Sequence, residues 1–311
     1  MSSAVQTRLP SHGTLASVFR DYAELVKARV TALIMMTVWC GFYFGAAKAA
    51  TSSLSWTLIH AVLGIGMAAG GTAALNEAME RDLDGRMRRT ALRPLVTGRM
   101  SLGWGIGVGT ALVLGGTVYL WTATNALAAL LTLATSVVYL AAYTPLKRVH
   151  PVCTFIGAFP GAMPPVLGWA AIRGQLDWEA LVLFAIVFFW QFPHFHSIAW
   201  LYREDYDRAH IRMLPVVDAD GRSTVREIMA YLTALLIATT APTLLGMAGP
   251  LYFLGAVVLG AGFFWTGWRL AASKLSPQNA ESKRLARHLL QASVLYLPLL
   301  FALMMLNARP S

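Results

Sequence analysis

The stretch from Leu58 to Gly85 reads LIHAVLGIGMAAGGTAALNEAMERDLDG and joins a long apolar run to a group of polar side chains. Asn76, Glu80 and Asp84 are spaced four residues apart, so on a helix their oxygen atoms form one column, and Asp82 lies away from it. Carboxylates stacked at the edge of an apolar segment repel one another unless a hard cation or protons neutralise them. The spacing therefore predicts a helix that ends in a polar, metal-binding face.

Arginines surround and follow this column. They are Arg81, Arg86, Arg88, Arg89, Arg93 and Arg99. Carboxylates that bind Mg²⁺ beside guanidinium groups that bind phosphate are typical of a diphosphate site. A charged connector between two membrane helices is the simpler interpretation of Arg86, Arg88 and Arg99, and the sequence leaves both open.

The composition excludes an ordinary soluble domain. The 311 residues are 57% hydrophobic and 13% charged, with a mean hydropathy of +0.56. The apolar residues form segments of membrane-spanning length, about 20 residues each. We expect nine spans, at about 30–49, 55–76, 103–121, 124–143, 154–172, 179–201, 228–247, 250–268 and 288–307. No linker interrupts them, so residues 1–311 are expected to form a single all-α integral membrane domain with an N-terminal segment, 1–29, before the first span.

Basic residues fix the expected orientation. With a cytoplasmic N-terminus, every Lys and Arg except Lys48, Arg173 and Arg309 falls on the cytoplasmic side, which satisfies the positive-inside rule. The net charge of +10 is then a consequence of topology and of contact with anionic membrane lipids. Nucleic-acid binding is not expected. We predict a multi-pass protein of the cell (inner) membrane, with its polar cap in the cytoplasm.

Five segments in one order carry a family resemblance. They are NEAMERDLDGRMRRTALRPL at 76–95, YTPLKR at 143–148, IGA with PP and GW within 156–169, WQFPHF at 190–195, and YREDY followed by MLP within 202–215. Together they resemble the UbiA superfamily of intramembrane prenyltransferases, and within it the branch that farnesylates haem. The resemblance extends from about residue 20 to 305.

The resemblance implies a fold and a reaction. The fold is a bundle of nine transmembrane helices with a cytoplasmic polar cap, which agrees with the spans and orientation derived from hydropathy and charge. The implied reaction transfers the farnesyl group of farnesyl diphosphate to a vinyl side chain of haem b (protohaem IX), and water completes the hydroxyethylfarnesyl substituent of haem O. Mg²⁺ is the implied cofactor. The chemistry needs cations for the departing diphosphate and a dry pocket for the allylic cation.

Site residues follow from the column and the resemblance. Asn76, Glu80 and Asp84 are expected to bind Mg²⁺, directly or through water. Tyr143, Lys147, Arg89 and Arg93 match superfamily positions that hold the diphosphate, and Arg148 and Arg203 are assigned to substrate binding within the same segments. Arg29 is a further carry-over from Lys27-Ala28-Arg29, where the family usually has proline in place of Ala28.

The second acidic segment departs from the broader superfamily. Many relatives have aspartates where Tyr202 and Tyr206 align, and the REDY form resembles the haem-specific branch. Asp205 is expected to be a second metal ligand. His194 is the candidate for haem contact because imidazole is a natural axial ligand of haem iron. His196 cannot share that face, since residues two apart on a helix diverge by about 200°.

Two alternatives remain at this stage. Another UbiA-type prenyltransferase, with an aromatic quinone precursor or chlorophyllide as acceptor, would use the same first motif, but a fuller DxxxD in the second segment would be needed to favour it. A cation-coupled secondary transporter would place its carboxylates near mid-membrane on broken helices, and here they gather at the rim beside arginines. Whether haem A synthase or a terminal oxidase assembly acts downstream is left open by the sequence.

Overall fold

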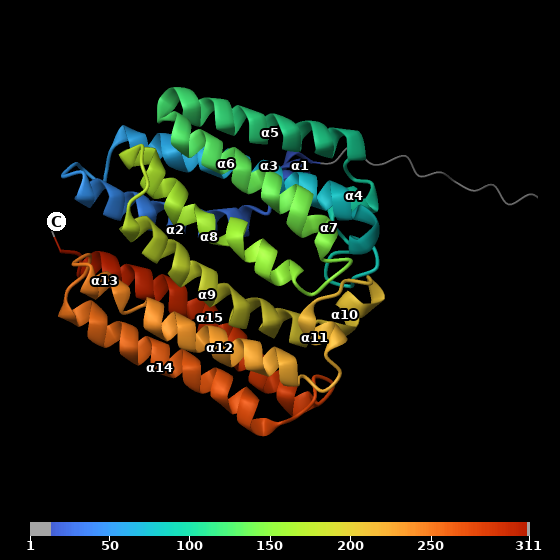
Figure 1. Cartoon of the computed structure of the whole chain (residues 1–311). Coiled ribbons are helices and arrows are strands. Elements are labelled where there is room, and N and C mark those ends of the chain that lie inside the picture. Colours follow the sequence, from blue (N-terminus) through green and yellow to red (C-terminus); the bar gives the residue numbers. More distant parts are fainter. Residues whose placement is uncertain (1–13, 310–311) are drawn as a thin grey trace, which may run out of the picture.

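Long, nearly parallel helices form a bundle in the computed structural model, which describes residues 14–309 (Figure 1). Nine segments of the described chain are long and apolar enough to cross a membrane. They are α2 (Ala28–Lys48), α3 (Trp56–Asp84), α5 (Leu102–Ala123), α6 with η1 and α7 (Ala126–Leu146), α8 (Cys153–Arg173), α9 (Trp178–Leu201), α12 with α13 (Arg222–Leu244), α14 (Pro250–Ser273) and α15 (Ala280–Leu306). The predicted number of spans and their order are confirmed, with ends shifted by several residues.

Short helices gather at one end of the bundle. α4 (Pro94–Thr97), α10 (Arg203–Arg208) and α11 (Leu214–Val217) lie together there, whereas α13 (Ala241–Leu244) and the described C-terminal end lie at the other (Figure 1). In the described chain α3 is the second span and α9 is the sixth, and a loop that follows an even-numbered span returns to the end at which the first span began. The polar loops after α3 and α9, far apart in sequence, therefore meet in one cap.

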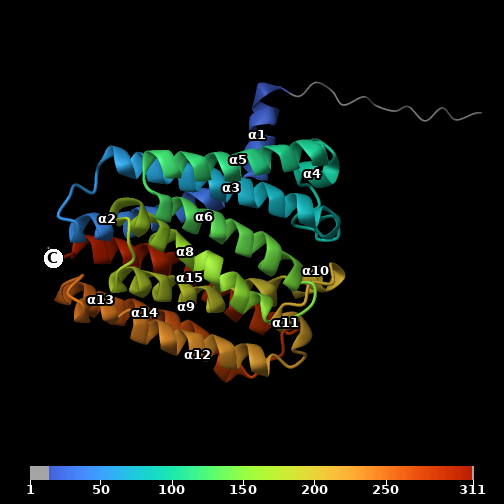
Figure 2. The ribbon, with the colours of Figure 1, turned by 45° about the horizontal axis from the view of Figure 1, so that its top comes forward.

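Glycines bring α2 and α8 into backbone contact. A Cβ atom on Gly41 would overlap with the Pro165 carbonyl oxygen, and one on Gly168 would overlap with that of Val38, both well inside van der Waals contact. Small residues allow such close approach, which favours helix association in a membrane where no hydrophobic force acts between helices. α2 and α8 thus form a tight central pair, with α3, α5 and α6 on one side and α9, α12, α14 and α15 on the other (Figures 1 and 2).

An additional helix, α1 (Leu15–Leu25), precedes the first span. Thr14 caps it by accepting a hydrogen bond from the Ser17 amide. The helix runs across the long helices rather than along them (Figure 2). From the sequence, this part was expected only as an N-terminal segment, of which the first thirteen residues lie outside the described part of the structure.

Candidate functional site: a polar cap of carboxylates and cations

The acidic column lies on the last turns of α3. The helix continues to Asp84, so Asn76, Glu80 and Asp84 share one face, and all three side chains are buried. Asp82 is exposed and points away from them. The helical spacing read from the sequence is therefore realised, and it places three oxygen-bearing side chains inside the cap rather than in solvent.

Each member of the column meets a cation from a different element. The Lys27 ammonium donates a hydrogen bond to Asn76 Oδ1 at 2.9 Å, and Arg93 Nη1 is 2.5 Å from Asp84 Oδ2. Lys147 forms an ion pair with Glu80. These cations come from the α1–α2 turn, the loop before α4 and the end of α7, so the tertiary fold assembles them.

The two lysines are crowded by other cations and withdrawn from water. Burial, together with the neighbouring charge of Arg93, lowers the pKa of Lys27 to about 8. Burial likewise lowers the pKa of Lys147 to about 7, with a smaller contribution from the charge of Lys27. Positive charges that disfavour one another in a desolvated space would be stabilised by an anionic ligand. The electrostatics of the cap are therefore compatible with an anionic ligand.

A π-helical turn places Tyr143 and Lys147. η1 (Tyr139–Tyr143) interrupts the helix between α6 (Ala126–Val138) and α7 (Thr144–Leu146). Pro145 has no amide hydrogen and would clash with the carbonyl of Ala141 in a regular helix, and the wider turn avoids this clash. Lys147 Nζ lies 5.4 Å from the centre of the Tyr143 ring. A helix defect of this kind is common at functional sites.

Arg89 is held by two tyrosines of the other loop. Its guanidinium donates a hydrogen bond to Tyr206 Oη at 2.6 Å and lies 4.8 Å from the Tyr206 ring centre and 5.2 Å from that of Tyr202. Such contacts combine a charged hydrogen bond with cation–π attraction. This contact joins the loop after α3 to helix α10. That the two tyrosines hold Arg89 was not predicted from the sequence.

Two carboxylates of α10 have basic partners. Asp205 pairs with Arg208, and Glu204 pairs with Lys283 of α15 at 2.6 Å. Arg203 donates to the carbonyl oxygens of Pro215 and Val216 at 2.8 and 3.0 Å, which connects α10 to α11. Asp205 as a second metal ligand and Arg203 as a substrate ligand stay predictions.

Glu77 is a candidate site residue that was not predicted from the sequence. Its side chain is fully buried, Oε1 accepts a hydrogen bond from the Leu95 amide at 3.3 Å, and Oε2 has no hydrogen-bond partner among the described residues. The charges of Arg93, Lys27 and Asp84 all act on it. Its position directly after Asn76 in an apolar helix was the available signal, since an ionisable residue there is costly unless it has a role.

The remaining predicted residues lie around the cap. Arg29, in the first turn of α2, and Arg148, after α7, are exposed. His194 on α9 is half-buried, stacks on Trp190 with 4.7 Å between ring centres, and bonds through Nδ1 to Ser293 Oγ at 2.8 Å. His196 is fully buried and pairs with Glu227 at 2.9 Å. The two histidines therefore contact different helices, as their spacing predicted.

The donor set is compatible with Mg²⁺. Within residues 14–309, no three His, Cys, Asp or Glu side chains converge tightly enough to enclose a metal ion by themselves. Mg²⁺ rarely needs such an enclosure, because it is usually bound by one or two carboxylates together with water and substrate phosphates. Glu80, Asp84 and the amide oxygen of Asn76 supply oxygen donors of that kind on one helix face.

Comparison with known proteins identifies the family. Residues 34–306, which include the whole acidic column and both cap loops, match the UbiA prenyltransferase family. The chain belongs to this family. It is 62% identical to a protoheme IX farnesyltransferase of Koribacter versatilis, over 99% of each chain, and 47% identical to one of Solibacter usitatus, over 93% of this chain and 98% of the relative.

Solved structures support the UbiA fold at low sequence identity. Digeranylgeranylglyceryl phosphate synthase superposes with a TM-score of 0.75 at 13% identity, over 94% of this chain and 98% of that one. A UbiA homolog from Archaeoglobus fulgidus bound to DMAPP and Mg²⁺ gives 0.62 at 16% identity, over 91% and 99%. The helical bundle is therefore the architecture of the family.

Proposed function

We propose that this chain is a protohaem IX farnesyltransferase, which transfers the farnesyl group of farnesyl diphosphate to a vinyl side chain of haem b and forms haem O. The observation that carries the proposal is the 62% identity, over 99% of each chain, with a relative of that name. The cap supports it physically, because its buried carboxylates and cations suit a metal-bound diphosphate.

In this proposal the cap residues stabilise the leaving group. The allylic C–O bond breaks and the diphosphate departs with its negative charge, which Arg89, Arg93, Lys27 and Lys147 would stabilise. Asn76, Glu80 and Asp84 would hold Mg²⁺, which supplies further charge stabilisation at the diphosphate oxygens. When ligands arrive, the lysines and Arg93 would exchange their contacts within the column for contacts with the anion.

The bundle provides the apolar surroundings. The farnesyl chain and the vinyl-bearing edge of the porphyrin are apolar, and a dry helical interior keeps water from quenching the allylic cation before the vinyl group attacks. A bond then forms between farnesyl C1 and one vinyl carbon, water adds to the other, and a proton is released. His194 is our candidate contact to the haem, because Ser293 holds its ring through a hydrogen bond and Trp190 stacks on it, and such partners orient metal-binding histidines.

The protein is a multi-pass membrane protein, and we propose that the cap faces the cytoplasm of the cell membrane. The bias of Lys and Arg towards the cap side supports this orientation. Farnesyl diphosphate would then reach the cap from the cytoplasm while its tail enters the bundle. Transfer of the product to a haem A synthase or to an oxidase assembly stays a prediction.

The test is a reconstituted assay with the full chain in lipid nanodiscs. Haem b, farnesyl diphosphate and Mg²⁺ are supplied, and extracted pigments are analysed by mass. We expect haem O from the wild type and from Asp82→Ala, and a large loss with Asp84→Ala and with a chelator. Absence of haem O from folded wild type, or prenylation of an aromatic quinone precursor instead, would refute the proposed acceptor.

A further inference from the structure

The α1 helix has an apolar stripe that the rest of the chain covers only in part. Leu15, Val18, Phe19, Tyr22 and Leu25 recur at helical spacing, so they form one face. Leu25 is completely buried against the bundle, whereas Leu15 is 90% and Phe19 76% exposed. The C-terminal half of the stripe thus packs on protein, and the N-terminal half is left open by the described residues.

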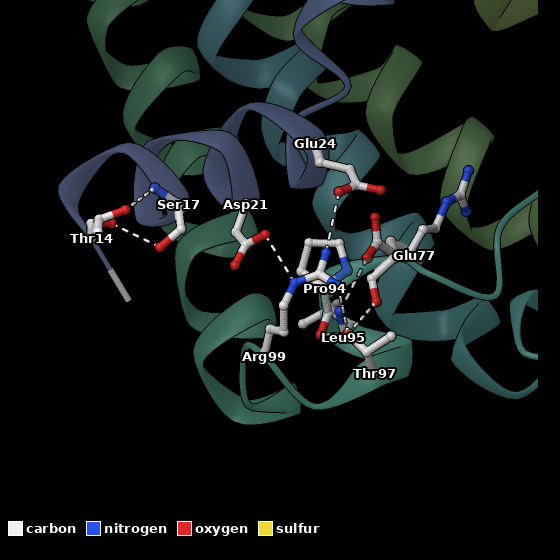
Figure 3. A network of polar contacts seen from close by, with 10 residues as sticks. Thr14, Ser17, Asp21, Glu24, Glu77, Pro94, Leu95, Thr97 and Arg99 are labelled. Atoms are coloured by element: carbon white, nitrogen blue, oxygen red, sulfur yellow. Dashed lines mark hydrogen bonds and ion pairs between the residues drawn. The ribbon is translucent and has the colours of Figure 1, made fainter. Parts of the chain in front are cut away.

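Polar contacts fix α1 across the bundle at the level where α5 begins. Arg99 donates to Asp21 at 3.0 Å and to Glu24 at 3.3 Å (Figure 3). Trp104, in the first turn of α5, donates from its indole nitrogen to Tyr22 Oη at 2.6 Å. The helix is therefore attached at the junction between the membrane-spanning segments and the polar cap, and its axis lies across them (Figure 2).

We propose that α1 is an interfacial helix that lies in the lipid headgroup layer on the cap side, with Leu15, Val18 and Phe19 inserted among the acyl chains. The position of α1 beside the start of α5 supports lipid as the occupant, because the neighbouring Trp104 is exposed and tryptophan favours the headgroup layer. Arg20, which is exposed and off the stripe, can meet lipid phosphates.

This placement connects the membrane surface to the candidate site. α1 leads directly into Lys27, a non-glycine residue with a left-handed backbone (φ 48°), and then into α2. Lys27 Nζ donates to Asn76 Oδ1 in the acidic column. A left-handed backbone is unfavourable for lysine, so it persists only where its surroundings hold it. An anchored α1 is part of those surroundings, so α1 acts as a positioning element for Lys27.

The lipid contact is tested by depth-dependent fluorescence quenching. The two native cysteines, Cys40 and Cys153, are buried, so a cysteine introduced on α1 is labelled selectively in the folded protein. Phe19→Cys and the matched control Arg20→Cys carry an environment-sensitive dye in vesicles of phosphatidylethanolamine and phosphatidylglycerol. Lipids with a nitroxide high on the acyl chain should quench position 19 several-fold more than position 20.

Two results would overturn the lipid proposal. Weak quenching at both positions would place α1 in water, and energy transfer between labelled copies without lipid quenching would show that another chain covers the stripe. Both measurements are independent of enzymatic activity.

The coupling to Lys27 rests on the proposed function and is tested separately. Leu15→Ser/Phe19→Ser should raise the KM for farnesyl diphosphate several-fold with little change in kcat, and Ala16→Ser, at an exposed position off the stripe, should leave both unchanged. An unchanged KM in the double variant would refute the coupling. An inactive wild type would instead refute the proposed function and leave the quenching result intact.

Discussion

The ion pair between Asp84 and Arg93 allows the metal-ligand and structural roles of the column to be separated. We consider Asp84→Asn, Arg93→Gln and the double variant. Asp84→Asn keeps the shape of the side chain and removes its charge. If Asp84 serves only as a partner for Arg93, the double variant should be about as active as Arg93→Gln alone. If Asp84 binds Mg²⁺, activity is lost whether or not Arg93 is present.

The expected cost in stability follows from burial. Removing one partner of a fully buried ion pair costs about 3–5 kcal/mol, because the other charge is left uncompensated. The side chain of Asp84 is only 1% exposed, but that of Arg93 is 20% exposed and can be partly hydrated. We therefore expect about 2 kcal/mol for Asp84→Asn, somewhat below that range. Since the two residues are in contact, the double variant should cost less than the sum, by about 1–2 kcal/mol.

The assay for stability uses the native cysteines. A maleimide dye that fluoresces on reaction reports unfolding as Cys40 and Cys153 become exposed, and a cost of about 2 kcal/mol should lower Tm by about 4–8 °C. Activity is measured as haem O formed at several Mg²⁺ concentrations. Asp84→Asn should reduce kcat/KM by roughly 10²-fold or more and raise the Mg²⁺ requirement, as loss of a transition-state contact does. Arg93→Gln should raise KM for farnesyl diphosphate without changing the Mg²⁺ requirement.

The result that refutes the reasoning is recovery of activity in the double variant. Recovery would mean that the carboxylate of Asp84 is needed only to neutralise Arg93. Recovery of Tm without recovery of activity is the outcome that we expect.

Three further predictions concern the packing and the cap. Gly168→Ala should destabilise the protein by about 1–3 kcal/mol, because its Cβ would overlap with the Val38 carbonyl oxygen, and the dye assay measures this. Tyr206→Phe keeps the ring but removes the acceptor of the 2.6 Å hydrogen bond from Arg89, so KM for farnesyl diphosphate should rise about fivefold, equivalent to about 1 kcal/mol. Glu77→Ala leaves a buried backbone amide without its acceptor and should cost about 1–3 kcal/mol in the same dye assay, most of which Glu77→Gln should restore.

Matched controls sharpen these predictions. Gly262 lies in α14, where a Cβ atom would have no heavy atom within 4 Å, so Gly262→Ala should be neutral or slightly stabilising. Tyr202→Phe should leave KM unchanged, because Arg89 meets only the ring of Tyr202. Equal effects of the two glycine substitutions, or of the two tyrosine substitutions, would contradict the contacts on which the predictions depend.

The membrane topology and the acidic column could be predicted from the sequence because both depend on local periodicity. Nine apolar runs of spanning length in the described chain are legible without knowledge of their neighbours, and the spacing of Asn76, Glu80 and Asp84 places them on one helix face whatever packs against it. The side of the bundle that forms the cap follows from the distribution of Lys and Arg. These properties depend only on residues that are close together in the sequence and on the thickness and charge of the membrane.

The tertiary structure alone decided which cation meets each member of the column. Lys27 and Lys147 are separated from Asn76 and Glu80 by many residues, and only the packing of α2 and α7 on α3 brings them together. The same holds for Arg89 and Tyr206, whose hydrogen bond joins two loops. The sequence by itself thus determined what kinds of groups the cap holds and on which side of the membrane it is expected. The pairing of those groups was decided by the tertiary structure, because contact between distant residues is set by helix packing and not by spacing along the chain.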